Sequence, residues 1–158
     1  MGGSAFVIRH ARAGRRSAWH GPDEMRPLSG PGRRQARAIA RMLRDEPITR
    51  VVSSPFARCV QTVEALAAGI GVTVEEDAML AEGRGIARAE TLARSAGDTG
   101  GVVLSSHGDV ILGLLDALGA AGVSLDGEPV AKKGSTWIFD VHEGAILHGT
   151  YVPPPGER

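Results

Sequence analysis

The protein has 158 residues and a formal net charge of zero, a length that suits one domain with a sizeable hydrophobic core. Hydrophobic residues make up 42% and charged residues 23%, as in ordinary soluble globular proteins, and the balanced charge argues against nucleic-acid and membrane partners. The single cysteine, Cys59, excludes an internal disulfide, and no segment approaches the roughly 18 apolar residues that cross a membrane. We therefore expect one cytoplasmic domain over residues 1–158, with its oligomeric state open.

The first predicted strand leads directly into two side chains that a buried strand does not need. Residues 5–8 are apolar without a break, which indicates a strand buried on both faces, and Arg9 and His10 follow at once. In an open α/β sheet, ligands bind just beyond the carboxyl ends of the strands. The pair therefore indicates either an anion site at the strand end or a solvated or helix-capping pair, and the dipeptide alone leaves both open.

A polar stretch and a helix follow the first strand. Residues 12–30 are polar, contain two prolines and show little periodicity, which predicts a loop that either faces a substrate or is merely solvated. A helix is predicted to start at Pro31 and to end before Pro47. Its apolar residues recur at helical spacing, at Ala36, Ile39, Ala40 and Leu43.

The second predicted strand, residues 50–53, precedes a helix whose first turn carries a cation. Ser54 is placed to cap this helix, Pro55 suits its first turn, and the helix is expected to end at Gly69. Arg58 in the first turn opposes the helix dipole, which prefers an anion at this end. An anionic ligand such as phosphate at the helix N-terminus would remove the conflict.

The rest of the chain continues the alternation of strands and helices. The predicted elements are an edge strand at 72–75, a weak helix at 87–95, a buried strand at 102–105, a helix at 110–118 and hairpin strands at 136–141 and 145–151. The strand at 102–105 runs on to His107, which repeats the arrangement of the first strand. This order predicts an α/β fold, a three-layer α/β/α architecture with a mostly parallel sheet.

Three strand ends would meet at one edge of such a sheet and bring together Arg9, His10, Arg58 and His107. Arginine pairs bidentately with phosphate oxygens, and a histidine among arginines has its protonated form disfavoured, which frees an imidazole nitrogen to act as a nucleophile. Two arginines and a second histidine would stabilise the charge of a phosphoryl transition state without a metal ion. Glu82, in the loop after the third strand, is a candidate general acid for the leaving oxygen.

Four segments, in order along the chain, resemble motifs of the histidine phosphatase (phosphoglycerate mutase-like) superfamily. Residues 9–11, Arg-His-Ala, resemble the family's Arg-His-Gly motif, and residues 106–108, Ser-His-Gly, resemble its second histidine motif. Residues 28–36 are similar to its Leu-Thr-x-x-Gly-x-x-Gln-Ala segment, and residues 53–62 to its Ser-Ser-Pro-x-x-Arg-x-x-x-Thr segment. The resemblance extends from Phe6 to about Phe139.

This resemblance implies the phosphoglycerate mutase-like fold and a role for each of five residues. It makes His10 the nucleophile that becomes phosphohistidine, and it makes Glu82, two residues after Leu80, the proton donor. Arg9, Arg58 and the second catalytic histidine, His107, would bind the phosphoryl group. No cofactor and no metal ion are expected.

The substrate class is left open by the sequence. The short chain and Arg26-Pro27-Leu28 look most like the SixA-type branch, which acts on protein phosphohistidine, and also like the related domain fused to MutT-type Nudix hydrolases, although this chain has no Nudix box. Arg16 lies near where mutases place an asparagine, which disfavours a mutase. We expect a metal-independent phosphatase of phosphohistidine or phosphomonoesters. The alternatives are a phosphatase of a small phosphorylated metabolite or nucleotide, and a non-catalytic phosphate-binding module, which the intact histidine pair disfavours.

Other reactive side chains have simpler interpretations. Cys59 does not begin a Cys-x5-Arg phosphatase loop, because Ala65 stands where the arginine would be, so a buried helical thiol is expected. His20, His142 and His148 lack metal-ligand spacing with carboxylates, so no metal site is predicted.

Overall fold

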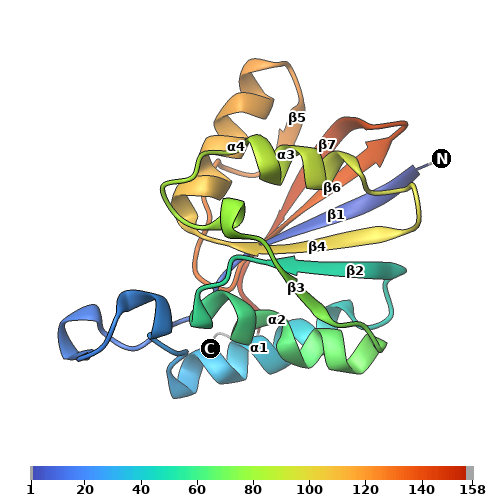
Figure 1. Ribbon diagram of the computed structural model, residues 1–158. Coiled ribbons are helices and arrows are strands. Elements are labelled where there is room, and N and C mark those ends of the chain that lie inside the picture. The colour runs from blue at the N-terminus through green and yellow to red at the C-terminus, as the bar shows by residue number, and fades with distance from the viewer. Residues whose placement is uncertain (1, 156–158) are drawn as a thin grey trace.

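A seven-stranded sheet runs through the centre of the protein, with helices on both of its faces (Figure 1). The computed structural model describes residues 2–155. The strands are β1 (Gly2–Arg9), β2 (Ile48–Ser53), β3 (Val74–Glu76), β4 (Gly101–Ser106), β5 (Ser124–Asp126), β6 (Thr136–His142) and β7 (Ala145–Val152). Their order across the sheet is β3-β2-β4-β1-β6-β7-β5. The pairs β1–β6 and β6–β7 are antiparallel and the other four are parallel, so the sheet is mostly parallel.

Two helices cover each face of the sheet. The first face carries α1 (Gly30–Leu43) and α2 (Ala57–Ile70), and the second carries α3 (Ala87–Arg94) and α4 (Gly108–Ala120) (Figure 1). Short 3₁₀-helices lie in the connections: η1 (Arg16–Ala18), η2 (Asp23–Met25) and η3 (Ala78–Leu80). The predicted α/β fold with three layers and a mostly parallel sheet is therefore confirmed.

Strand β1 shows how the sheet is buried on both sides. Successive side chains of a strand point to opposite faces. Ala5 and Val7 accordingly pack into the hydrophobic core beneath α3 and α4, while Phe6 and Ile8 pack into the core beneath α1 and α2. All four side chains are almost fully buried. The unbroken apolar run is thus the signature of a central strand, and Arg9 lies where the chain leaves these two cores.

The two helices of the first face begin in different ways. Helix α1 has the Ser29 hydroxyl as its cap, which accepts a hydrogen bond from the Gly32 amide at 3.2 Å. Helix α2 has Phe56 at the N-cap position and no side-chain cap, so the prediction that Ser54 caps it is wrong. The Ser54 hydroxyl lies 2.9 Å from His107 Nε2 and accepts from the amide of the N-cap residue Phe56 at 3.3 Å, but it reaches no amide within the helix. Helix α2 continues to Ile70, one residue beyond the predicted end.

The other predicted boundaries lie close to the observed ones. From residue 72 onward, each predicted strand and helix lies within two residues of its observed limits at either end. Strand β5 was not predicted, because three residues are too short to show a periodicity. The predicted domain extent, residues 1–158, includes residues 1 and 156–158, which lie outside the described residues, and it stays a prediction, as does the cytoplasmic location. Among the described residues, no helix has the length and apolar character needed to cross a membrane.

Candidate active site

The carboxyl ends of β1, β2 and β4 meet at one edge of the sheet. The His10 amide donates to the Ser106 carbonyl at 3.0 Å and the Ser54 amide donates to the Ser105 carbonyl at 2.9 Å, which fixes the three ends relative to one another. A pocket of about 190 Å³ opens at this edge. It is lined by Arg9, His10, Arg16, Arg26, Arg58, Glu82, His107, Gly108, Asp109 and Lys133. The structure thus brings together all five site residues that the sequence predicted.

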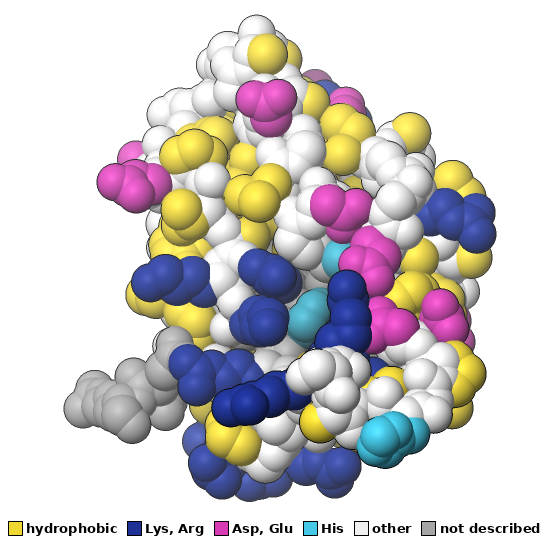
Figure 2. Space-filling model, turned by 90° about the vertical axis from the view of Figure 1, so that its left-hand side faces the viewer, with side chains coloured by type: hydrophobic (Ala, Val, Ile, Leu, Met, Phe, Trp, Pro, Cys, Tyr) yellow, Lys and Arg dark blue, Asp and Glu magenta, His cyan; other side chains and the backbone are white. Residues whose placement is uncertain are grey.

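Charge is unevenly distributed around this pocket. Figure 2 looks onto this side of the protein, and histidine side chains lie near the centre of the view. Lysine and arginine side chains gather to the left of them and below, whereas carboxylates gather on the right. A pocket with buried imidazoles and an excess of cations suits an anionic ligand.

His10 is held as a neutral imidazole with one nitrogen available. Its Nδ1 lies 2.8 Å from the Ala11 carbonyl oxygen, which only accepts hydrogen bonds, so Nδ1 carries the proton and Nε2 keeps its lone pair. Burial, together with the charges of Arg58 and Arg9, lowers the pKa of His10 to about 3, although the carbonyl contact acts in the opposite direction. At neutral pH the imidazole therefore offers a free nitrogen, as a nucleophile requires.

His107 lies beside His10, with the two ring centroids 5.6 Å apart and the ring planes at 67°. Its Nε2 contacts the Ser54 hydroxyl at 2.9 Å and the Cys59 Sγ at 3.5 Å. Burial, followed by the charge of Arg58, lowers the pKa of His107 to about 4, so this ring is also neutral at pH 7. Cys59 is fully buried, as predicted, and burial raises the pKa of its thiol to about 12, which makes it a packing residue rather than a thiolate.

Arg9 reaches the pocket from the end of β1 beneath the N-terminus of α4. Its Nη1 donates to the Ala131 carbonyl at 2.7 Å, and its buried Nε has no hydrogen-bond partner among the described residues. A Cβ atom at Gly108 would lie only 2.9 Å from the Arg9 Cζ, so glycine there lets the guanidinium approach the helix start. An unpaired buried donor next to a helix N-terminus is a favourable position for an anion.

Arg58 projects from the first turn of α2 and is 1% exposed. Its Nη2 lies 3.1 Å from Asp23 Oδ2 and 3.2 Å from Glu82 Oε1, and its Nη1 donates to the Asp23 carbonyl. These two carboxylates offset the charge of Arg58 at the start of the helix, and the anionic ligand that the sequence predicts there stays a prediction. The Nε of Arg58 is buried without a partner among the described residues, so the guanidinium keeps an unused donor.

Thr62 joins two of the predicted motifs. Its hydroxyl accepts a hydrogen bond from the Ala11 amide at 2.9 Å and donates to the Arg58 carbonyl at 2.7 Å. The residue after His10 is thereby fixed to the helix that carries Arg58. This buried link holds the segment after β1 and the first turn of α2 in a fixed relation.

Several residues at the pocket were not predicted. Asp23 and Arg26 come from the polar loop, where the Arg26 Nε donates to Asp23 Oδ1 at 2.9 Å and its Nη1 donates to the Gly14 carbonyl. Lys133 comes from the loop before β6. The arginine content of residues 12–30 was the one available signal, but it fixes no geometry. Asp109 lies in the first turn of α4, and its Oδ2 accepts from the Gly83 amide at 2.8 Å, next to Glu82 in the chain.

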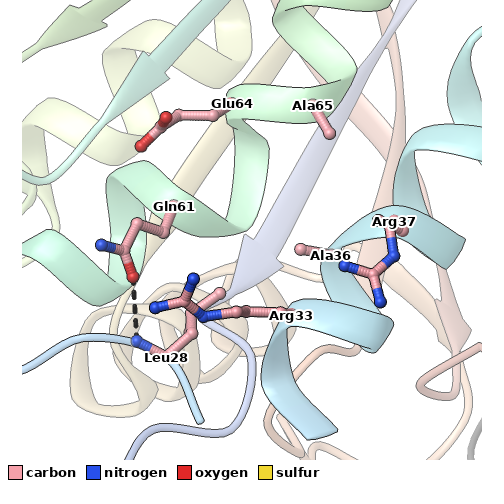
Figure 3. Close-up of a pocket in the computed structure, with 7 residues that line it drawn as sticks. All are labelled: Leu28, Arg33, Ala36, Arg37, Gln61, Glu64 and Ala65. Atoms are coloured by element: carbon pink, nitrogen blue, oxygen red, sulfur yellow. Dashed lines mark hydrogen bonds between the residues drawn. The ribbon is translucent and has the colours of Figure 1, made fainter. Parts of the chain in front are cut away.

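A larger hollow lies elsewhere, between α1 and α2 (Figure 3). It has a volume of about 500 Å³, and Figure 3 shows Arg33 extending from α1 toward Gln61 on α2. The Gln61 Oε1 accepts from the Leu28 amide at 2.9 Å and so holds the end of the polar loop. No histidine or other nucleophile lines this hollow. Within residues 2–155, no group of three or more His, Cys, Asp or Glu side chains is arranged to hold a metal ion.

Known proteins share both the sequence pattern and the fold. The chain is 31% identical, over 98% of its length, to the 8-oxo-(d)GTP phosphatase of Mycolicibacterium smegmatis, and it spans 49% of that relative. The structure of the protein histidine phosphatase SixA complexed with tungstate superposes with a TM-score of 0.71 at 24% identity, with 94% of each chain covered. The phosphoglycerate mutase of Bacillus anthracis superposes with a TM-score of 0.67 at 14% identity, covering 96% of this chain and 91% of the mutase.

The solved structures establish a phosphoglycerate mutase-like fold, as expected from the sequence motifs. The sequence comparison is more specific. The model of the histidine phosphatase superfamily, branch 1, matches residues 5–85, just over half of the chain, and this stretch carries Arg9, His10, Arg58 and Glu82. A match of that extent, over the segments that build the pocket, means that the chain belongs to the histidine phosphatase superfamily.

Proposed function

We propose that this protein is a metal-independent phosphatase that forms a covalent phosphohistidine on His10. The observation that carries the proposal is the state of His10, a neutral imidazole whose Nδ1 is bound to the Ala11 carbonyl. Arg9 and Arg58 line the same pocket as His10, and each carries a buried Nε without a hydrogen-bond partner among the described residues. A nucleophile beside two cationic donors suits attack on a phosphoryl group, whose oxygens those donors would bind.

The first chemical step transfers the phosphoryl group to the protein. His10 Nε2 forms a bond to phosphorus while the bond from phosphorus to the leaving oxygen breaks, and the electron pair stays on that oxygen. The carboxylic acid of Glu82 supplies the proton that this oxygen takes up. Arg9, Arg58 and His107 stabilise the charge on the equatorial phosphoryl oxygens.

The second step releases phosphate. A water molecule attacks the phosphohistidine and gives a proton to the Glu82 carboxylate, which restores the acid. The bond between phosphorus and Nε2 breaks, and the lone pair returns to the imidazole. Because Nδ1 donates to the Ala11 carbonyl throughout, the ring keeps one orientation in both steps.

The proposed substrates are phosphohistidine or phosphomonoesters. A fold shared with the protein histidine phosphatase SixA supports the first of these. The second candidate, a small phosphorylated metabolite or nucleotide, is favoured by the 31% identity to a relative named as an 8-oxo-(d)GTP phosphatase. A non-catalytic phosphate-binding module is disfavoured, because binding alone gives no reason for a neutral histidine with a free nitrogen.

Trapping the intermediate tests this proposal. We would mix the protein with p-nitrophenyl phosphate in EDTA, quench in alkali, where the nitrogen–phosphorus bond survives, and analyse the peptides by mass spectrometry. One phosphoryl group is expected on the peptide containing His10, and none on the His10→Ala variant. The exposed His20→Ala variant serves as the matched control and should label normally. Turnover that is lost on chelation and restored by a divalent metal would contradict the proposal.

A further inference from the structure

A second hollow adjoins the catalytic pocket and is strongly cationic. It is a groove of about 1060 Å³ lined by Arg12, Ala13, Arg15, Ser29, Pro31, Lys132 and Lys133. Lys133 lines both the groove and the catalytic pocket, so the two hollows are neighbours. Four of the seven groove residues are cationic and none is acidic, whereas the catalytic pocket contains Glu82 and Asp109. We call this hollow the basic groove.

The walls of the basic groove are held in place by buried contacts. The Gln35 side chain, 5% exposed, accepts from the Arg12 amide at 2.9 Å and donates to the Lys133 carbonyl at 3.2 Å. The Ser29 amide and hydroxyl both donate to the Arg12 carbonyl. Gln35 therefore joins the two loops that supply the groove cations, and this gives residues 28–36 a structural role that the proposed chemistry does not use.

Close packing around the groove allows little change in its shape. A Cβ atom at Gly32 would overlap the Arg12 carbonyl oxygen, and one at Gly134 would lie 2.9 Å from the Gln35 Nε2. Gly134 also has a φ of 84°, which favours glycine. The backbone that carries the groove cations is therefore preorganised, whereas the cationic side chains themselves are exposed.

The cations of the two hollows act on one another. The pKa of Lys133 is lowered, first by burial and then by the charges of Arg9, Arg26, Arg12 and Arg58. No carboxylate is among the groups that shift it. A bound group with negative charge next to Lys133 would remove this repulsion, so the unliganded arrangement itself favours a polyanion.

We propose that the basic groove binds a second phosphate group of the substrate, so that the substrate class is a small molecule with a phosphoanhydride chain, such as a nucleoside diphosphate. This inference rests on the proposed function and names the substrate class of the same site. The catalytic pocket, at about 190 Å³, has room for the transferred phosphoryl group, and the groove that shares Lys133 with it supplies Arg12, Arg15 and Lys132 as further cations. Because Lys133 lines both hollows, a phosphate in each of them could belong to one phosphoanhydride chain.

The transfer step then has a defined leaving group. His10 Nε2 bonds to the terminal phosphorus, and the bond from that phosphorus to the bridging oxygen breaks. The electron pair stays on the bridging oxygen, which becomes a terminal oxygen of the shortened phosphate chain. Lys133 borders the position where this charge develops, and water later releases inorganic phosphate from the histidine.

The test compares ADP with AMP, which differ by the second phosphate. In EDTA, wild-type protein should have a higher kcat/KM for ADP than for AMP. The variant Arg15→Ala/Lys132→Ala removes two exposed groove cations that do not line the catalytic pocket. It should lower the ADP/AMP ratio of kcat/KM by about tenfold. The matched control is Arg33→Ala/Arg37→Ala, which removes two cations at the other hollow and should leave the ratio as in the wild type.

A binding measurement separates this inference from the proposed function. Calorimetry with inorganic pyrophosphate and with phosphate needs no turnover, and the groove variant should lose affinity for pyrophosphate about tenfold more than for phosphate. If the wild type binds pyrophosphate in this way but hydrolyses no phosphate ester, the proposed function fails and the groove stands. The groove inference is overturned if turnover occurs but the groove variant changes neither the ADP/AMP ratio of kcat/KM nor the ratio of the affinities for pyrophosphate and phosphate. A phosphohistidine peptide preferred over ADP, with no sensitivity to the groove variant, would also overturn it.

Discussion

The floor of the catalytic pocket, formed by His10 and Arg58, is buried, whereas its rim, which includes Glu82 and Arg16, is exposed to solvent. On the floor, His10 is 6% exposed and Arg58 1%, and a side-chain nitrogen of each contacts a backbone carbonyl, that of Ala11 and that of Asp23 respectively. On the rim, the side chains of Glu82 and Arg16 are 40% and 69% exposed, and both residues lie in connections between strands and helices of the sheet layers. Burial controls protonation on the floor, whereas solvent screens the charges on the rim. We infer that the floor sets the chemistry and that the rim tunes which phosphate it receives.

The largest effect is expected on the floor. His10→Ala should lower turnover of p-nitrophenyl phosphate by about 10³-fold or more, because it removes the proposed nucleophile. The side chain lies outside the hydrophobic cores, so circular dichroism and the melting transition should show a folded protein. Vanadate should still bind, since Arg9 and Arg58 are intact. Full activity in a folded variant would refute the assignment of His10.

Glu82 tests whether a rim residue takes part in the chemistry. A general acid matters most for a poor leaving group, so Glu82→Gln should slow an alkyl phosphate by about 10²–10⁴-fold and p-nitrophenyl phosphate much less. The measurement is kcat for the two substrates side by side. Equal slowing of both would assign Glu82 to positioning Arg58, which it contacts at 3.2 Å. If neither slows, the proton comes from another group or the natural substrate needs none.

The buried histidines should also make the fold sensitive to acid. Burial lowers the pKa of His10 to about 3 and that of His107 to about 4, whereas the unfolded chain takes up these protons near pH 6.5. Stability is therefore full above pH 6.5 and falls as the pH drops toward 4, by about 1.4 kcal/mol per pH unit for each histidine. Urea unfolding from pH 7 to 4.5 should show this slope. The slope should flatten in His10→Gln/His107→Gln. An unchanged slope would show that the two buried histidines do not cause the acid sensitivity.

Local patterns in the sequence were enough to predict the residues that follow buried strands. Arg9, His10 and His107 were found because each follows an apolar run that marks a buried strand, and parallel strands place their ends together. Arg58 was found because a cation in the first helical turn opposes the helix dipole, and Glu82 because it lies in the loop after the third predicted strand. The motif resemblance then implied a role for each. These positions depend on patterns within about ten residues, and the structure brings all five to one pocket.

Contacts between distant loops could not be predicted in this way. Asp23 meets Arg58 35 residues further along the chain, and its place depends on how the polar loop folds against α2. Ser54 looks like a helix cap in the local sequence, but its partner is His107, 53 residues away. The basic groove likewise combines Arg12 with Lys133 through Gln35. None of these pairs has a periodic signal, because each depends on tertiary packing.

The smallest predicted effect concerns Asp23, a carboxylate that contacts Arg58 without lining the pocket itself. Asp23 Oδ2 lies 3.1 Å from Arg58 Nη2, and Oδ1 lies 2.9 Å from Arg26 Nε. A phosphate bound to Arg58 must compete with this charge, so Asp23→Asn, which keeps the shape and an acceptor oxygen, should tighten anion binding. We expect KM and the inhibition constant of phosphate to fall about threefold, with little change in kcat.

The neighbouring carboxylate provides the control for this last prediction. Glu24 is exposed and does not line the catalytic pocket, so Glu24→Gln changes the net charge equally without touching Arg58. If both variants tighten phosphate binding alike, the effect is one of net charge, and Asp23 does not compete at Arg58. If Asp23→Asn instead weakens binding, its carboxylate orients the guanidinium for phosphate, and Asp23 would have to be counted with the floor in setting the chemistry.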